Sequence, residues 1–97
     1  MIAVRVRVVQ FRLSDGVSHE EYLALASSVA PAFAEWDGLV SKVWLHDPVG
    51  DTYGGVYLFS SAKAADASRE TELFRAMVAN PSFRDVSIQE HDVLTPA

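Results

Sequence analysis

The sequence contains no cysteine among its 97 residues. This absence excludes disulfide bonds, a thiolate nucleophile, zinc–thiolate sites and iron–sulfur clusters. The eight Lys and Arg residues are scattered along the chain and are outnumbered by thirteen Asp and Glu residues, which gives a net charge of −5. Nucleic acids and anionic membranes are bound by concentrated positive charge, so we expect neither as a partner.

Long apolar runs are missing as well. No uncharged stretch approaches the roughly 20 residues that span a bilayer. The amino-terminal stretch "MIAVRVRVVQF" has no long uncharged segment of the kind found in signal peptides. We therefore expect a cytoplasmic protein. The sequence also has no glycine-rich phosphate loop and no serine in a nucleophile elbow.

What is present indicates one globular domain. Hydrophobic residues make up 49% of the chain and charged residues 22%, a balance typical of folded proteins rather than disordered ones. Ninety-seven residues are enough for one modest core, so residues 1–97 are predicted to form a single domain.

Strict alternation of apolar residues predicts the strands. In residues 2–13 one set of alternate positions faces one side and the other set faces the opposite side, the period of a β-strand. Residues 39–46, 53–60 and 85–94 are predicted to form three more strands. The first strand is apolar on both sides: Ile2, Val4, Val6 and Val8 share one face, and Ala3, Arg5, Arg7, Val9 and Phe11 share the other.

Two helices are predicted between these strands. Ser18 and Glu21 form a capping box at the start of the first, and Gly38 is expected to end it. Pro31 is expected to kink or split it, because its ring removes a backbone hydrogen bond. The apolar stripe of this helix is Tyr22, Ala26, Val29, Phe33 and Trp36.

The second helix is expected to run from Ser60 or Ser61 to about Asn80. Its core stripe is predicted to be Ala67, Thr71, Phe74 and Val78. The order of elements is then βαββαβ, which predicts an α+β, ferredoxin-like sandwich with a four-stranded antiparallel sheet. Two helices cover one face of such a sheet, yet both faces are apolar. We therefore expect a homodimer that packs sheet against sheet.

The hairpin at residues 42–59 has an unusual composition. If His46 pairs with Tyr53, then Trp44 lies opposite Gly55 and Lys42 lies opposite Tyr57. One face of the hairpin is then aromatic and partly polar, and the opposite face is aliphatic. The aromatic face consists of Lys42, Trp44, His46, Tyr53, Tyr57 and Phe59.

Glycine at position 55 has two interpretations. It makes room for the packing of Trp44, or it leaves a hollow that the indole lies across or that a flat ligand enters. An aromatic, partly polar pocket is typical of small-molecule sites. We expect the aromatic face to meet the helices; in the alternative arrangement it lies inside the dimer interface.

The segments G-L-x-x-K-V-W (residues 38–44) and G-G-V-Y-L-F (residues 54–59) resemble the YdhR-type putative monooxygenases of the dimeric α+β barrel superfamily. The usual Pro-Gly before the second strand is Asp37-Gly38 here. The resemblance implies a dimeric barrel of two ferredoxin-like subunits, each with a pocket between sheet and helices. Similar proteins include cofactor-free monooxygenases, haem-degrading enzymes and muconolactone isomerases.

His46 is the candidate proton-handling, catalytic residue, because it shares the aromatic face. The candidate substrate-binding residues are Trp44, Tyr57, Phe59, Phe33, Trp36 and Arg7. Arg5 and Arg7 have an alternative role as partners of Glu90, Asp92 or a second subunit, because buried arginines need counter-ions.

The remaining histidines are weaker candidates. His19, in the first turn of a helix, is expected to be solvated, and the face of His91 is not assigned. Nothing in the spacing supports a metal site built from His46, His91 and an acid. A haem-degrading relative is expected to carry an axial histidine on the second helix, and residues 61–79 contain none. No cofactor or metal is therefore predicted.

Three functional hypotheses remain. The first is a cofactor-independent monooxygenase acting on a small aromatic or polyketide-like phenolic substrate, which would itself supply the electrons. The second is an isomerase or cyclase on the same scaffold. The third is a non-catalytic dimer that binds a small hydrophobic ligand. The choice rests mainly on the resemblance, since a fold alone does not specify an activity.

Overall fold

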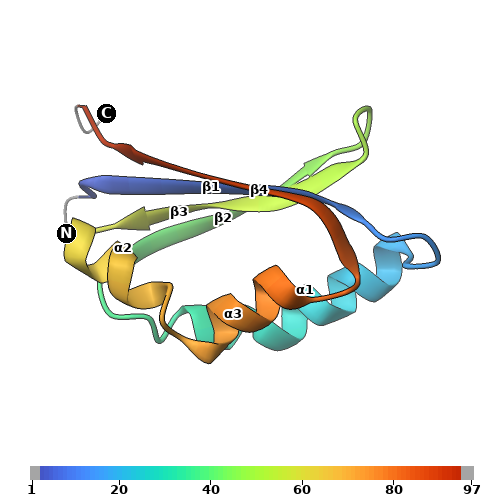
Figure 1. Ribbon diagram of the computed structural model, residues 1–97, viewed down its shortest axis with the longest axis horizontal. Helices are drawn as coiled ribbons and strands as arrows, with labels where there is room; N and C mark the ends of the chain where they lie inside the picture. Colours follow the sequence, from blue (N-terminus) through green and yellow to red (C-terminus); the bar gives the residue numbers. More distant parts are fainter. Residues whose placement is uncertain (1–2, 95–97) are drawn as a thin grey trace.

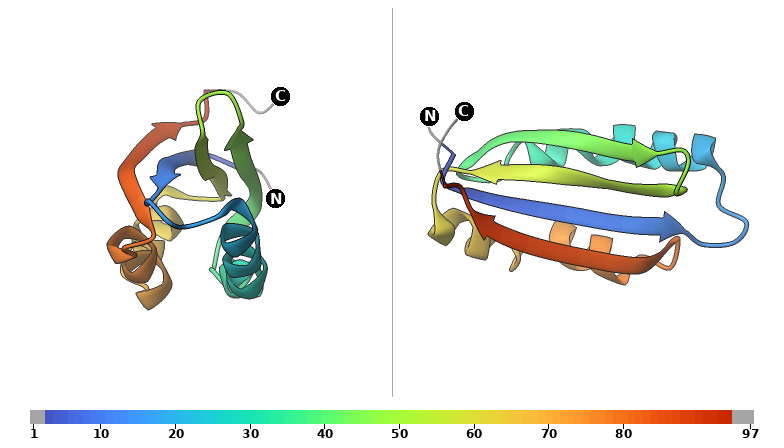
Figure 2. Two further views of the ribbon diagram at one scale, coloured as in Figure 1. Left: turned by 90° about the vertical axis from the view of Figure 1, so that its right-hand side faces the viewer. Right: turned by 90° about the horizontal axis from the view of Figure 1, so that it is seen from above.

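The computed structural model describes residues 3–94, which form a four-stranded antiparallel sheet with three helices on one face (Figure 1). The strands lie in the order β2-β3-β1-β4, as the view from above in Figure 2 shows. The predicted ferredoxin-like α+β fold is confirmed. The elements are β1 (Arg5–Leu13), α1 (His19–Phe33), β2 (Leu39–Asp47), β3 (Thr52–Phe59), α2 (Ala62–Ser68), α3 (Glu72–Ala79) and β4 (Phe83–Asp92). None of the helices in this part of the chain is long and apolar enough to cross a membrane.

The β2–β3 hairpin has the predicted register. His46 pairs with Tyr53, and Trp44 pairs with Gly55. Because side chains two residues apart in a strand share a face, this pairing gathers the aromatic residues of both strands on one side. The register shifts only near the start of β2, between Leu39 and Ser41.

The two faces of the sheet differ in their cover. The helix-facing side chains of the sheet are largely aromatic and buried: Val9, Phe11, Tyr53, Tyr57 and Phe59. On the opposite face Val43 is 53% exposed and Val4 is 43% exposed. The end-on view in Figure 2 shows that the helices lie on one side of the curved sheet only. Within residues 3–94 the second apolar face therefore has no cover, while Ile2, expected on that face, lies outside the described residues.

Helix α1 begins as predicted. The Ser18 hydroxyl accepts a hydrogen bond from the Glu21 amide, and the Glu21 carboxylate accepts one from the Ser18 amide. Of the two effects expected of Pro31, a kink or a split, the split does not occur, because α1 continues through it to Phe33. A proline this close to the end of a helix removes only one backbone bond before the helix stops.

Gly38 does not end α1, contrary to the expectation. The helix is already capped at Ala34, and Gly38 lies just before β2 with a φ of 77°. A Cβ atom at Gly38 would lie 2.5 Å from the Cβ of Ala64 in α2. Glycine is therefore needed here for a positive φ and for the close approach of the chain to α2.

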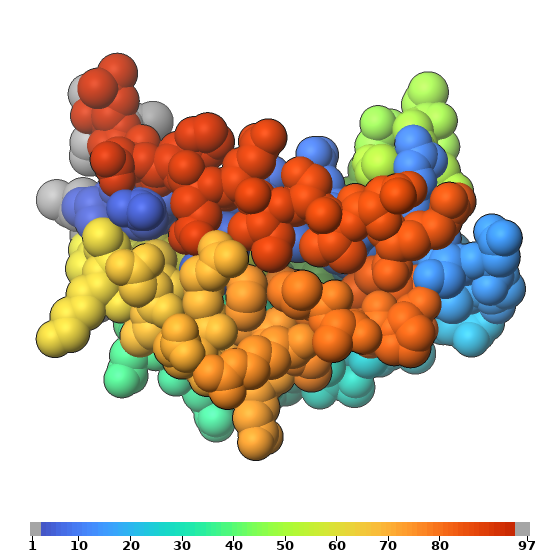
Figure 3. All heavy atoms as spheres, in the orientation of Figure 1, coloured from blue at the N-terminus to red at the C-terminus, as the bar shows by residue number. Residues whose placement is uncertain are grey.

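The prediction of one helix from Ser60 or Ser61 to about Asn80 is wrong, because the segment forms two helices, α2 and α3. The backbone of Thr71 is extended, with φ −78° and ψ 152°, and its hydroxyl accepts a hydrogen bond from the Phe74 amide. Thr71 is thus an N-cap rather than a helix-interior residue. In Figure 3, α2 and α3 lie together beneath β4 on one side of the molecule.

The break changes which side chains face the core. Ala65 and Ser68 of α2 and Phe74 of α3 are buried. Ala67 and Val78, both expected in the core stripe, are exposed. A single helical stripe cannot continue across a non-helical residue, so the periodicity restarts at Thr71.

Candidate functional site

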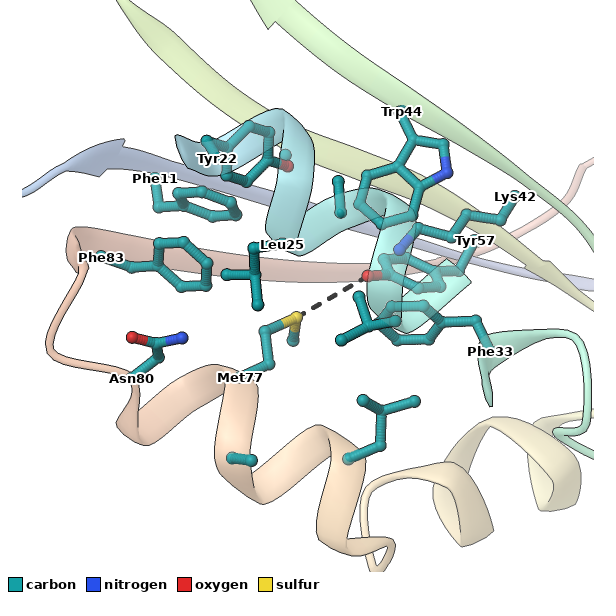
Figure 4. A pocket seen from close by; sticks show the side chains of 15 residues that line it. Phe11, Tyr22, Leu25, Phe33, Lys42, Trp44, Tyr57, Met77, Asn80 and Phe83 are labelled. Carbon is teal, nitrogen blue, oxygen red and sulfur yellow. Dashed lines mark hydrogen bonds between the residues drawn. The ribbon is translucent and has the colours of Figure 1, made fainter. Parts of the chain in front are cut away.

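A partly enclosed cavity of about 150 Å³ lies between the helix layer and the sheet. Figure 4 shows its aromatic side chains around a central space, with Met77 entering from α3. The aromatic residues that line it are Phe11, Tyr22, Phe33, Trp44, Tyr57 and Phe83. Aliphatic side chains of α1 and α3 complete the walls, chiefly Leu25, Val29 and Leu73. Walls of this kind are typical of sites for small molecules.

Lys42 is the one charged side chain among the residues that line this cavity. Its Nζ lies 3.4 Å from the ring centroids of both Phe33 and Trp44, and 4.4 Å from that of Tyr57. None of the ion pairs formed within residues 3–94 involves Lys42. The amine is thus surrounded by aromatic faces, with no carboxylate to balance it.

This environment changes the acidity of the amine. Burial lowers the pKa of Lys42 from 10.5 to about 7, because the ammonium loses its hydration on entering the cavity. The ring faces attract a cation, but they do not replace a shell of water. Near neutral pH the side chain is therefore present as both ammonium and neutral amine.

The double glycine in β3 explains how Lys42 reaches this position. A Cβ atom at Gly55 would lie 3.2 Å from the Cε of Lys42. The space expected beside Gly55 is therefore occupied by the aliphatic chain of Lys42, with the Tyr57 ring 3.4 Å from the same position. A Cβ atom at Gly54 would lie 1.8 Å from the carbonyl oxygen of Val9, so Gly54 is needed for the close pairing of β3 with β1.

Two tyrosine hydroxyls belong to the same cavity. The Tyr57 hydroxyl donates to the sulfur of Met77 at 3.7 Å, drawn as the dashed line in Figure 4. Burial raises the pKa of Tyr57 above its usual value and raises that of Tyr22 to about 12. Both hydroxyls stay neutral near pH 7 and act as hydrogen-bonding groups, which leaves Lys42 as the group that titrates there.

Three of the predicted substrate-binding residues meet at the cavity. Phe33 packs edge-on against Trp44 at 5.9 Å and against Tyr57 at 5.7 Å between ring centroids. Trp36 and Phe59 pack next to them, with their rings stacked at 6.3 Å. These two do not line the cavity, and Phe59 is completely buried. They support the wall rather than form it.

Arg7 lies away from the cavity and has protein partners. It is fully buried, and its guanidinium donates to the hydroxyl of Ser68 at 2.9 Å and to the carbonyl oxygen of Ala65 at 2.8 Å. It also forms an ion pair with Glu90 at 3.2 Å. The alternative role predicted for this arginine, pairing with Glu90, matches these contacts. They join β1 and β4 to α2.

His46 shares the predicted face but lines a neighbouring groove between α1 and the edge strand β2. Its ring stacks on Tyr53 at 4.4 Å and lies 5.0 Å from the ring of His19. His19 is exposed, as expected, but its Nδ1 also lies 2.7 Å from the Tyr53 hydroxyl. The groove and the cavity share three lining residues, Tyr22, Ala26 and Trp44.

The donor atoms do not fit a metal or a haem. No histidine lines the cavity, and His91 pairs with Val6 on the uncovered face of the sheet. Within residues 3–94 no group of three or more His, Asp or Glu side chains is placed to hold a metal ion. A haem would lack a histidine ligand here, and a space of about 150 Å³ is small for a porphyrin.

Sequence reasoning missed part of the cavity. Met77 and Asn80 at the end of α3 and Phe83 at the start of β4 line it. Their inward direction depends on the break at Thr71, which the pattern did not reveal. The sequence predicts that Lys42 lies on the aromatic face of the hairpin, but it assigns this residue no function. Its signal was a cation alternating with aromatic residues, with no acidic residue opposite it.

Solved structures share this fold. A protein of unknown function from Nitrosomonas europaea aligns with a TM-score of 0.82 and 15% identity, over 98% of this chain and 93% of that one. The cofactor-independent oxygenase SnoaB from Streptomyces nogalater gives 0.78 and 13%, over 98% and 97%. The heme-degrader MhuD from Mycobacterium tuberculosis gives 0.75 and 21%, over 96% and 98%. At these identities the likeness shows the fold alone.

Sequence comparison identifies the family. No curated protein matches the chain in sequence. The family described as "Putative mono-oxygenase ydhR" matches residues 7–97, nearly the whole chain. The predicted resemblance is confirmed over a much longer stretch than the hairpin that suggested it. The chain belongs to the ydhR putative mono-oxygenase family.

Proposed function

We propose that this protein is a cofactor-independent monooxygenase that oxidises a small aromatic, phenolic substrate in the cavity between α1, α3 and the sheet. One observation carries the proposal: an aromatic cavity with a single uncompensated amine, that of Lys42, and no histidine in its lining. Membership of the family supports the reaction type. SnoaB, a cofactor-independent oxygenase with the same fold, supports the absence of a cofactor.

The chemistry requires little from the protein. A deprotonated phenol or anthrone is electron-rich enough to donate electrons to dioxygen itself. In the simplest case an anthrone methylene loses two C–H bonds and becomes a carbonyl, one oxygen atom enters the product, and the other leaves as water. The cavity would bind the ring, favour its anion and exclude bulk water.

The size of the cavity limits what it encloses. An apolar cavity of about 150 Å³ is large enough for one benzene ring, and this cavity has that volume. A single-ring phenol would be enclosed, whereas a polyketide-like substrate would place its reacting ring inside and extend the rest through the opening. We therefore favour a substrate whose phenolic ring lies at one end.

An isomerase or cyclase is the second candidate. One observation favours it: an amine with a pKa near 7 is suited to moving a proton in either direction. Such an enzyme would convert its substrate without consuming oxygen. A non-catalytic binding protein would release its ligand unchanged.

The proposal includes a homodimer. The uncovered sheet face carries exposed Val4 and Val43, and a second copy of the chain would bury them. The two sheets would then form the barrel that the family resemblance implies.

The cytoplasmic location expected from the sequence also stays a prediction.

Oxygen consumption tests the reaction. Chelator-treated protein is mixed with a hydroxyanthrone, and dissolved oxygen and the quinone product are followed together. We expect one oxygen molecule consumed per quinone formed, at a rate well above that of the buffer. Conversion without oxygen uptake would favour the isomerase, and recovery of unchanged ligand would favour the binding protein.

A matched pair of variants locates the reaction. Leu25 of α1 lines the cavity, while Leu23 of the same helix is 49% exposed and does not. Leu25→Trp should fill the cavity and lower kcat/KM by about 10-fold or more, equivalent to about 1.4 kcal/mol. Leu23→Trp should leave it unchanged. Equal activity in the two variants would place the reaction elsewhere.

A further inference from the structure

We infer that Lys42 is the acid–base group of the cavity, and that the ligand class it selects is a planar ring carrying a weakly acidic hydroxyl, such as a phenol or an enol. The role in turnover rests on the proposed function. The binding and ionisation of the ligand do not, and they are tested separately below.

The first argument is the missing counter-ion. The Lys42 Nζ lies against Phe33, Trp44 and Tyr57. The cavity lining contains no carboxylate from any of the elements that form it. A buried cation without a partner is unfavourable, so the free protein keeps an amine whose partner has to come from outside.

The second argument concerns the other groups that face the amine. Tyr22 from α1 and Tyr57 from β3 are the other titratable side chains in the lining, and burial raises the pKa of each. The residues contributed by α3 and β4 are neutral, with Asn80 the most polar of them. Among the residues that line the cavity, Lys42 is therefore the group that can accept a proton from a bound ligand near neutral pH.

The third argument is chemical fit. A phenol enters an apolar cavity as a neutral molecule. When the hydroxyl is about as acidic as the Lys42 ammonium, its O–H bond then breaks, an N–H bond forms at Lys42, and the products are a phenolate and an ammonium ion in contact. A carboxylic acid is ionised in solution, and its carboxylate would lose a much stronger hydration shell on entering the cavity than a neutral phenol does. The cavity therefore favours the weaker acid.

The geometry also places the reacting atom. The amine lies at the end of the cavity formed by Phe33, Trp44 and Tyr57, while Phe11 and Phe83 lie at the far end in Figure 4. A ring held between these ends would direct its hydroxyl toward Lys42. The phenolate oxygen would then be held by a charge-assisted hydrogen bond.

The test uses 4-nitrophenol, whose anion absorbs visible light while its neutral form does not. Nitrobenzene, which has the same ring without the hydroxyl, is the matched probe. Binding of each is measured at a pH only slightly below the pKa of free 4-nitrophenol, where part of Lys42 is still a neutral amine, for the unmodified protein, Lys42→Met and Lys63→Met. Methionine has a similar length to lysine, and Lys63 is exposed on α2, away from the cavity.

We expect the unmodified protein and Lys63→Met to bind 4-nitrophenol and to develop the absorption band of its anion. Lys42→Met should lose that band and weaken binding by about 10-fold or more, as expected when one ion pair is lost. It should still bind nitrobenzene, which shows that the cavity is intact. An anion band that persists in Lys42→Met would overturn the inference.

Other outcomes are equally decisive. If the unmodified protein does not bind 4-nitrophenol, or binds it without ionising it, the inference fails. If the ionised probe binds but hydroxyanthrones cause no oxygen uptake, the inference stands and the proposed monooxygenase activity fails. His46→Ala provides the competing test, because loss of the anion band in that variant would assign proton handling to His46 instead.

Discussion

At the scale of single residues, the feature that matters most is the uncompensated amine of Lys42. Its Cε occupies the space left by Gly55, and its Nζ lies over the rings of Phe33 and Trp44. These rings exclude water from the amine without supplying a negative charge to balance it. The position is therefore unfavourable for an unpaired ammonium ion and favourable for a neutral ligand that can become an anion beside it.

Stability should depend on pH through this residue. Burial lowers the pKa of Lys42 to about 7 from 10.5, so between these values the unfolded chain binds more protons than the folded one. Stability should then rise with pH across this window, by roughly 1–3 kcal/mol after a discount for partial exposure. Urea unfolding at several pH values measures the change.

The matched variants separate Lys42 from the rest of the chain. Lys42→Met should be more stable than the unmodified protein near pH 7 and should lose most of the rise, because no buried amine remains to be charged. Lys63→Met, altered at an exposed position, should keep the rise. A rise of equal size in all three proteins would contradict the assignment.

The two adjacent glycines should respond differently to alanine. In Gly54→Ala the new Cβ would lie 1.8 Å from the Val9 carbonyl oxygen, and backbone atoms of paired strands cannot yield. We expect Gly54→Ala to lower the free energy of unfolding by roughly 3 kcal/mol or more. In Gly55→Ala the nearest atoms are the Cε of Lys42, which can move by a few tenths of an ångström, and the carbonyl oxygen of Val43, both at 3.2 Å, far less crowded than the 1.8 Å at Gly54.

Urea unfolding and 4-nitrophenol binding measure both variants. Gly55→Ala should lower the free energy of unfolding by roughly 1 kcal/mol. Its main effect should be on the ionisation of bound 4-nitrophenol, because the new methyl group displaces the Lys42 amine. If the two substitutions were equally destabilising, the close pairing of β3 with β1 at Gly54 would not be the reason for that glycine.

At the scale of secondary-structure elements, the break between α2 and α3 shapes the cavity. Thr71 holds it, since its hydroxyl donates to the Ser68 carbonyl oxygen at 2.7 Å and accepts from the Phe74 amide at 3.2 Å. The second helix of the pair can then turn so that Leu73 and Met77 line the cavity. In one unbroken helix the buried side chains would form a single continuous stripe, and the segment after Thr71 could not turn independently toward the cavity.

Removing this cap should loosen α3 specifically. Thr71→Ala should cost about 1 kcal/mol and increase amide exchange in residues 72–79, because the orphan amide of Phe74 loses its acceptor. Ser61→Ala removes the equivalent cap of α2 and is the control. It should cost a similar amount but leave nitrobenzene binding unchanged, whereas Thr71→Ala should weaken it. Equal effects on binding would argue against a special role for α3.

At the scale of the whole molecule, the uncovered face of the sheet is the dominant feature. The helices bury one face, and the aliphatic face of the hairpin remains open, with Val43 53% exposed. Apolar patches that extend over several strands are characteristic of interaction surfaces. In the proposed homodimer a second copy of the chain, which carries the same apolar face, would cover it through a two-fold interface.

Light scattering should therefore give the mass of a dimer at micromolar concentration. Val43→Lys places a charge on the uncovered face and should shift the protein toward the monomer, because the ammonium would lose its hydration in the interface. Val49→Lys is the control, since Val49 is 95% exposed in the β2–β3 turn. A monomeric unmodified protein, or a dimer that is indifferent to Val43→Lys, would contradict a sheet-to-sheet interface.

The sequence by itself determined the features that depend on local periodicity. Alternation predicted the strands, and a turn centred so that His46 faces Tyr53 predicted the observed pairing of Trp44 with Gly55. The capping box at Ser18 and Glu21 needed only four consecutive residues. These features are local because a strand or a helix start is specified by its own side chains and backbone bonds.

Only the tertiary structure decided what meets across elements. Arg7 donates to the Ser68 hydroxyl and the Ala65 carbonyl oxygen, which lie far along the chain, and no local pattern specifies such contacts. The same holds for His46, which shares a face with Trp44 yet lines a different hollow, because α1 lies between the groove and the cavity. The charge state of Lys42 depends on burial by three rings, and burial is a property of the packed molecule rather than of the sequence around the residue.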